Sequence, residues 1–176
     1  MPSLRQLSVI LMAPSQLLCM SPCRVSVTRE VLDFLECQAA DATRHETGGI
    51  IAGSGSVDEG TVVVSRASDG GPAASSTLTS FSRDTRHCQA LLDGWAGEST
   101  GRIDYLGEWH KHFENEPSPS RRDICTLASI ARDQAYHVAA PILFIIGQSN
   151  SRSSLRVFLI DAEACCAATD WEVREE

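Results

Sequence analysis

The stretch from Gly107 to Asp123, GEWHKHFENEPSPSRRD, carries most of the structural information in this 176-residue chain. Its first part alternates in polarity as a β-strand does, and a strand points every second side chain to the same face. His110 and His112 would therefore project together, while the residues on either side of His110 point away. After a turn rich in Pro and Ser, residues 121–133 have apolar positions at helical spacing, so Asp123 falls in the first turn of a predicted helix.

The segments around this stretch alternate between strand-like and helix-like patterns. Helical spacing predicts helices over 28–41, with Thr28 as the N-cap, and over 85–97. Apolar or β-branched runs predict strands over residues 24–27, 45–53, 61–64, 78–81, 103–112, 141–146 and 155–160, and the Gly- and Ser-rich residues 68–76 are predicted to form a loop. This order of elements indicates an α+β sandwich built on a mixed or curled sheet.

The composition is that of an ordinary globular domain, with 43% hydrophobic and 22% charged residues. A chain of 176 residues fits one domain, which can bury enough surface to be stable without disulfide bonds. The net charge of −8 argues against nucleic acid or an anionic membrane as a partner and favours a protein with a basic or neutral face. No apolar run reaches the ~20 residues of a membrane span.

The seven cysteines show no paired C-x-x-C spacing, which favours free thiols in a reducing cytoplasm over a zinc ribbon or a disulfide framework. The first residues resemble a signal peptide only faintly, because Gln, Pro and Ser interrupt the apolar stretch. We therefore expect a cytoplasmic protein with a loosely ordered leader over 1–22, with Met20 as an alternative start. A domain over 23–162 and a C-terminal tail over 163–176 would follow.

His110, His112 and Asp123 form a candidate metal site. Two imidazoles one pleat apart, joined by a carboxylate from the next helix, could hold a zinc ion and leave one position open for water, as a catalytic zinc site requires. Each half of the pattern also has a simpler explanation. An H-x-H pair can lie on a solvated strand without a metal, and Ser120 with Asp123 can be an N-cap and its capping-box partner.

Taken together, these residues resemble the JAMM motif of JAB/MPN-domain metallopeptidases. In that motif a Glu precedes His-x-His, and Ser-x-x-Asp follows seven residues later; here these positions are Glu46 in ETGGIIAG, then His110, His112, Ser120 and Asp123. The resemblance extends from about residue 25 to residue 160. It implies the cytidine-deaminase-like α/β sandwich of that family, in which helices flank a curled mixed β-sheet.

The resemblance also implies a role for each motif residue. His110, His112 and Asp123 would bind one zinc ion per chain, with a water as the fourth ligand. Glu46 would accept a proton from that water and later deliver it to the leaving amine. Ser120 would donate a hydrogen bond to the oxyanion of the tetrahedral intermediate.

Within this family, the sequence YLGEWHKH, with PSPS before the aspartate, is more similar to the bacterial JAB peptidases of antiphage conjugation operons. This similarity implies an isopeptidase that cuts after the C-terminal tail of a ubiquitin-like protein or a CBASS nucleotidyltransferase. Such an enzyme releases the modifier from conjugates or processes its precursor. The E1- and E2-like proteins of the same operon are further candidate partners.

Two positions near the motif need separate comment. Phe113 stands where the family usually has Pro directly after the second His, which leaves the following loop less constrained. Glu108 shares the predicted strand face with both histidines. It could support them or face a substrate, or it could be a solvated surface carboxylate.

Other functions remain open from the sequence. A metal-free MPN scaffold that only holds partners together is one alternative, and a cysteine peptidase using Cys88 with His87 or Cys125 is another. For the metallopeptidase, the residue 68–76 loop and the predicted helix over 85–95 are candidate walls of the substrate groove.

Overall fold

A computed structural model describes residues 23–113, 117–149 and 152–175. The strands are β1 (Arg24–Thr28), β2 (Gly48–Ser56), β3 (Thr61–Ala67), β4 (Ser75–Ser76), β5 (Phe81–Ser82), β6 (Asp104–His112), β7 (Ile142–Ser149), β8 (Arg152–Ile160), β9 (Cys166–Thr169) and β10 (Trp171–Arg174). The helices are α1 (Arg29–Asp41), α2 (Thr85–Glu98) and α3 (Arg121–Arg132), with a short 3₁₀ turn over Gln134–Tyr136.

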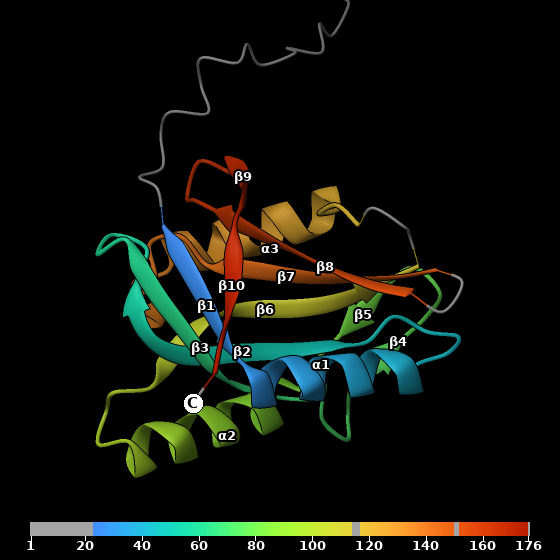
Figure 1. Cartoon of the computed structure of the whole chain (residues 1–176), viewed down its shortest axis with the longest axis horizontal. Coiled ribbons are helices and arrows are strands. Elements are labelled where there is room, and N and C mark those ends of the chain that lie inside the picture. The colour runs from blue at the N-terminus through green and yellow to red at the C-terminus, as the bar shows by residue number, and fades with distance from the viewer. Residues whose placement is uncertain (1–22, 114–116, 150–151, 176) are drawn as a thin grey trace, which may run out of the picture.

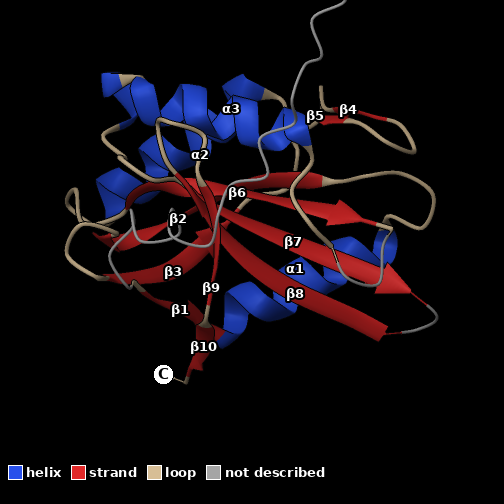
Figure 2. Ribbon diagram, turned by 90° about the horizontal axis from the view of Figure 1, so that it is seen from above, coloured by secondary structure: helices blue, strands red, loops and turns tan. Residues whose placement is uncertain are grey.

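One curled sheet of eight strands forms the centre of the domain, in the order β10-β1-β3-β2-β6-β7-β8-β9 (Figure 1). The β1–β10, β1–β3 and β6–β7 pairs are parallel and the other pairs in this sheet are antiparallel, so the sheet is mixed. Helix α1 covers one face, and α2 and α3 cover the other (Figure 2). The predicted α+β sandwich with a curled mixed sheet is therefore confirmed.

Each face of the sheet has its own apolar core. The core under α1 contains Leu35 of the helix together with Val25 of β1 and Trp109 of β6. The core under α2 and α3 is built around residues such as Leu127 and Leu143. Because β6 runs through the middle of the sheet, its alternate side chains reach opposite faces, and those of Trp109 and Lys111 are fully buried on the α1 side.

The starts of two helices follow directly from local sequence. The Thr28 hydroxyl accepts a 3.4 Å hydrogen bond from the Val31 N–H, which caps α1 as predicted. At α3, Ser120 and Asp123 form a reciprocal capping box, in which each side chain accepts a hydrogen bond from the other residue's backbone N–H. This box holds the first turn of α3, and therefore Asp123, in one orientation.

One expectation was wrong. The segment from Leu78 to Phe81 was expected to be a strand, but only Phe81 lies in one, the two-residue β5. Thr77 and Ser80 close a tight turn between β4 and β5, with the Thr77 N–H donating to the Ser80 carbonyl at 2.7 Å. Ser and Thr favour such turns because their hydroxyls compete for backbone groups, and this local preference outweighs the apolar side chain at Leu78.

The C-terminal residues belong to the sheet. Strands β9 and β10 follow one another in the chain but lie at opposite edges, β9 beside β8 and β10 beside β1. At the end of β9, the Thr169 hydroxyl donates a 3.2 Å hydrogen bond to the Cys23 carbonyl, just before β1. The chain thus passes from one edge of the curled sheet to the other, which holds the two edges together.

Two further sequence expectations can be compared with the described residues. No disulfide joins the cysteines in the described ranges. In the same ranges, no helix is long and apolar enough to cross a membrane. The expected leader over residues 1–22 lies outside the described residues, and the domain limits at residues 23 and 162 stay predictions.

Candidate active site

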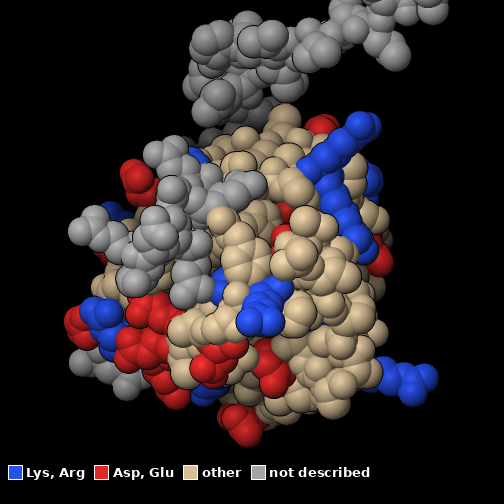
Figure 3. All heavy atoms as spheres, turned by 90° about the vertical axis from the view of Figure 1, so that its right-hand side faces the viewer, with Lys and Arg blue, Asp and Glu red and all other residues tan. Residues whose placement is uncertain are grey.

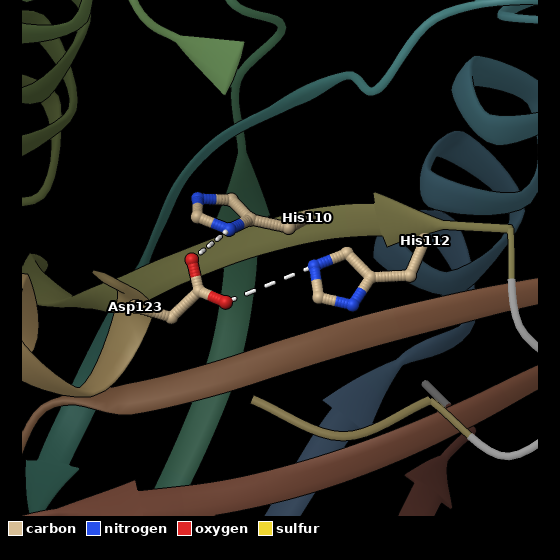
Figure 4. Close-up of side chains that lie close together, drawn as sticks. All are labelled: His110, His112 and Asp123. Carbon is tan, nitrogen blue, oxygen red and sulfur yellow. Dashed lines mark ion pairs between the residues drawn. The ribbon is translucent and has the colours of Figure 1, made fainter. Parts of the chain in front are cut away.

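Strand β6 and helix α3 bring the predicted metal-binding residues together. His110 and His112 project from the same face of β6, and Asp123 reaches them from the first turn of α3 (Figure 4). The Asp123 carboxylate lies 3.1 Å from His110 Nδ1 and 3.8 Å from His112 Nε2. One donor atom from each residue lies within 4.8 Å of the other two.

This donor set fits a metal ion. Two imidazole nitrogens and one carboxylate oxygen bind zinc at roughly 2.0–2.2 Å, so the atoms must converge to within a few ångströms of one another. The three side chains are at most 15% exposed. The residues present thus match a site for one divalent cation, with three protein ligands and space on the side of the cavity.

Glu108 and Arg83 form an ion pair beside His110 Nε2, the ring nitrogen that does not face Asp123. The Glu108 carboxylate, 4% exposed, lies 3.3 Å from His110 Nε2 and also pairs with the Arg83 guanidinium. Burial raises the pKa of Glu108, but His110 and Arg83 outweigh it and lower that pKa. Because Nε2 of His110 faces this carboxylate, Nδ1 is the nitrogen turned toward Asp123, an arrangement typical of metal-binding histidines. The alternative of a solvated Glu108 is therefore wrong.

Opposing effects act on the pKa values of the donor residues. Burial lowers the pKa of His110, but the neighbouring carboxylates of Asp123 and Glu108 outweigh it and raise the pKa to about 9. Burial raises the pKa of Asp123, but contacts with His110 and Ser120 lower it to about 2. In the metal-free protein, His110 is thus a cation at neutral pH between two carboxylates.

Metal binding is expected to release a proton from His110, since only the neutral imidazole can bind a metal. Below about pH 9 this competition should lower the apparent metal affinity by about tenfold for each unit by which the pH falls. In the metal-free protein the raised pKa stabilises the fold fully below the unfolded value of about 6.5, and this contribution is lost as the pH rises through about 9. Titration calorimetry at pH 7.5, in buffers of different ionisation enthalpy, measures the number of protons released when the metal binds. A binding heat that is independent of the buffer would contradict this release.

Arg83→Met is expected to destabilise the fold, because it leaves the buried Glu108 carboxylate without its guanidinium partner. Breaking such a pair costs roughly 3–5 kcal/mol, and the nearby His110 places this case at the lower end. Urea unfolding of the metal-free protein measures the loss. The double variant Arg83→Met/Glu108→Gln removes the charge as well and should lose less. A double variant as unstable as the sum of its single changes would contradict the pairing.

Glu46 lies in the segment between α1 and β2 and lines the same cavity as the two histidines. Its side chain is half-buried, and this burial raises the pKa of Glu46 against the opposing attraction of His112 and His110. A close approach of β2 to β6 places this segment beside the site. A Cβ on Gly48 would lie 2.4 Å from the Trp109 carbonyl oxygen, so a larger residue would push the strands apart.

The cavity around these residues has a volume of about 750 Å³. Its lining includes Glu46, residues 78–83, Thr85, Glu108, His110, His112, Phe113, residues 118–123 and Thr126. Figure 3 shows the side of the molecule on which β4 and β5 lie in Figure 1, where acidic side chains gather below a smaller group of basic ones. The basic residues in the cavity wall are Arg83, Arg121 and Arg122.

The expected groove walls were only partly correct. No residue of the 68–76 loop lines the cavity, and α2 contributes Thr85 alone. The loop instead folds onto the start of α2, where the Asp84 carboxylate accepts a 3.2 Å hydrogen bond from the Ala73 N–H. The wall comes from the turn and strand that follow, and the ring of Phe81 there packs edge-on against His110 with 6.0 Å between centroids.

Three residues of this region were not identified from the sequence as parts of the site: Phe81, Arg83 and Lys111. Phe81 and Arg83 are more than twenty residues before the histidines, and no spacing rule connects them to the motif. Lys111 stands between the histidines, but the hydrogen bonds of its ammonium lie on the other face of the sheet.

The sheet, the helices on both its faces and the His-His-Asp cluster beside a half-buried glutamate define an α+β domain with a candidate metal site. The chain belongs to the family described as prokaryotic homologs of the JAB domain, whose model matches residues 28–159. The family resemblance read from the motif is therefore confirmed.

Curated relatives and solved structures agree with this assignment. A "CD-NTase/cGAS isopeptidase" of Enterobacter hormaechei subsp. hoffmannii (strain UCI 50) is 31% identical over 123 residues, 70% of this chain and 67% of that protein. A "Probable metalloprotease y4qB" of Sinorhizobium fredii (strain NBRC 101917 / NGR234) is 33% identical over 117 residues, 64% of this chain and 70% of that protein. Family and relatives together indicate a metal-dependent hydrolase of the peptidase class.

The solved structure of protein DSY2949 from Desulfitobacterium hafniense has the same fold, with a TM-score of 0.64 over 86% of this chain and 94% of that chain. Its sequence identity is 19%, so this likeness concerns the fold alone.

Proposed function

We propose that this protein is a zinc-dependent isopeptidase or peptidase. It would cut after the C-terminal tail of a ubiquitin-like modifier or a CBASS nucleotidyltransferase, in a bacterial antiphage conjugation system. The observation that carries the proposal is the convergence of His110, His112 and Asp123 in one cavity with Glu46. The similarity to a protein named CD-NTase/cGAS isopeptidase supports the substrate class.

The donor set favours zinc over the hard cations. Imidazole suits zinc and other late transition metals, whereas magnesium and calcium prefer all-oxygen sites. A zinc ion at His110, His112 and Asp123 would supply a Lewis acid that polarises a carbonyl and lowers the pKa of water to about 7.

Glu46 is the proposed general base. As a half-buried carboxylate beside the cluster, it would take the proton of the attacking water and return it to the leaving amine. Burial raises the pKa of Glu46 above that of an ordinary glutamate, which makes its carboxylate a stronger base and moves its pKa toward neutral pH, where one group can accept a proton and later return it.

Ser120 is the proposed oxyanion donor. Its Oγ accepts a 3.2 Å hydrogen bond from the Asp123 N–H, which fixes the oxygen at the cavity wall. The hydroxyl proton can still point toward the substrate carbonyl, because accepting a bond does not use it. Donors of this kind lower the barrier by about 2.7–4 kcal/mol.

An extended substrate tail has a strand beside which it can bind. Among the described residues, strand β5 pairs only with β4 in a two-stranded sheet, and its residues Phe81 and Ser82 line the cavity. Strand addition there would supply main-chain hydrogen bonds, while the cavity walls select the side chains next to the cut.

The structure gives no support to a cysteine nucleophile at Cys88. Its thiol is 3.6 Å from the Ser68 hydroxyl, and burial raises the pKa of Cys88. The neighbouring His87 instead contacts Asp69, with 2.9 Å between Nε2 and the carboxylate. A catalytic thiol needs a lowered pKa and a base within reach.

The test combines metal analysis with cleavage. Purified protein should contain about one zinc per chain, and it should release a ubiquitin-like protein or a CD-NTase joined through its C-terminus to a lysine of a test peptide. A chelator should abolish cleavage and added zinc should restore it. Cleavage that persists in chelator would exclude the metallopeptidase. Well under one zinc per chain, with no cleavage and with His110→Ala indistinguishable from wild type, would favour the scaffold alternative.

A further inference from the structure

Lys111 is the sole lysine in the sequence, in which the other fourteen basic side chains are arginines. It is also fully buried, in the middle of the H-x-H motif. A buried lysine is costly unless its charge is satisfied. Its use where every other basic position is Arg indicates a site that needs a compact ammonium on an unbranched stem rather than a planar guanidinium.

The Lys111 ammonium makes hydrogen bonds at the end of α1, and it also lies over the Phe113 ring, 4.7 Å from the ring centroid. The ammonium donates hydrogen bonds to the carbonyl oxygens of Ala39, at 2.7 Å, and Ala42, at 2.5 Å. The last carbonyls of a helix lack partners within the helix and carry the negative end of its dipole. Helix α1 has no basic residue in its own last turn, so a cation from β6 satisfies this end.

The same residue also holds the far end of the segment that follows α1. The backbone N–H of Lys111 donates to the Thr47 carbonyl at 2.8 Å, directly after Glu46. The Glu46 N–H donates to the Thr77 carbonyl at 2.9 Å. Residues 42–47 are therefore held at their start by the Lys111 ammonium, and near their end by the Lys111 backbone and the β4–β5 turn.

From these contacts we infer that Lys111 is a positioning residue for Glu46, an inference that rests on the proposed function. The Lys111 side chain extends from β6 on the face opposite to the two histidines. There it binds the end of α1, from which the 42–47 segment leads to Glu46. The hydrogen bonds of the Lys111 ammonium lie on the face of β6 opposite to the two histidines, and its one contact with a cavity-lining residue among the described residues is with the ring of Phe113. The effect of Lys111 passes through the 42–47 segment and sets the distance between the base and the metal-binding residues.

Lys111→Met tests the inference, since it keeps the length of the side chain and removes the donors. We expect kcat to fall 10- to 100-fold with KM and zinc content nearly unchanged, because small displacements of a catalytic group have effects of this size. Trp109→Phe is the matched control. It removes one buried hydrogen bond, from the indole N–H to the Ser68 carbonyl, on the same face of β6 but with a partner outside the 42–47 segment. This control should keep the wild-type kcat.

A double-mutant cycle separates positioning from general damage. If Lys111 acts through Glu46, Lys111→Met should have no further effect on kcat in a Glu46→Gln background. Equal losses in both backgrounds would overturn the inference. Lys111→Arg should not rescue activity, because the guanidinium is too large and planar for this fully buried position. Full rescue by Arg would also count against it.

Hydrogen exchange gives a readout that does not need activity. In Lys111→Met the amides of Thr43 and Glu46 should exchange at least tenfold faster, while amides in β7 and α3 keep their rates. Unchanged exchange at these two amides would overturn the inference even if the enzyme is active. If wild-type protein cleaves no conjugate, the proposed function fails, and the exchange experiment still decides whether Lys111 holds the segment.

Discussion

Glu46→Gln is expected to lower kcat by at least a thousandfold and to leave about one zinc bound per chain. The amide has nearly the shape of the carboxylate but cannot take a proton from water, so the chemical step loses its base while the metal-binding residues are untouched. Burial raises the pKa of Glu46, which suits it to accept a proton and to give it back near neutral pH. Single-turnover cleavage and metal analysis of the same preparation measure the two effects.

The control is Glu59→Gln, which neutralises an exposed carboxylate in the turn between β2 and β3 and should keep the wild-type rate. Turnover of Glu46→Gln within tenfold of wild type would remove Glu46 from the mechanism. A loss of zinc in this variant would instead show that Glu46 helps to hold the metal.

Asp123→Asn is expected to lower the zinc affinity more than a hundredfold and to abolish cleavage. The substitution removes the charged ligand, and loss of even the residues that support metal ligands costs 10- to 100-fold. Helix α3 should persist, since the amide oxygen of Asn can still accept the hydrogen bond that the Asp123 carboxylate now receives from the Ser120 N–H at 2.8 Å. Zinc competition with a chromogenic chelator and helical circular dichroism measure both outcomes.

Ser120→Ala is expected to lower activity while the metal stays bound, the opposite of the effect on metal binding expected for Asp123→Asn. Ser120→Ala removes the hydroxyl that caps α3, at a cost of about 1 kcal/mol in unfolding free energy, and the proposed oxyanion donor, but it leaves all three metal-binding residues. We expect bound zinc with a kcat lowered roughly 10²- to 10³-fold.

Normal zinc affinity in Asp123→Asn would contradict the proposed ligand set.

The motif shows how far sequence reasoning reaches. Strand alternation placed His110 and His112 on one face, and the capping pattern placed Asp123 in the first turn of α3. The structure brings these residues together, and their catalytic roles remain predictions. Only the tertiary structure shows that the Arg83–Glu108 pair contacts His110, because Arg83 comes from a loop 25 residues before Glu108.

The sequence by itself predicted most helices and strands and the mixed α+β architecture, since periodicity and caps depend on neighbours a few positions apart. It also predicted His110, His112 and Asp123 as a candidate metal site, whereas Glu46 was added only through the resemblance to the JAMM motif. The tertiary structure decided which turn forms the cavity wall, that β9 and β10 hold the two sheet edges, and that the Lys111 ammonium satisfies the end of α1. These features depend on contacts between residues distant in the chain. Such contacts form only when whole elements pack to bury apolar surface, and no local pattern encodes which carbonyl or carboxylate will then meet a given side chain.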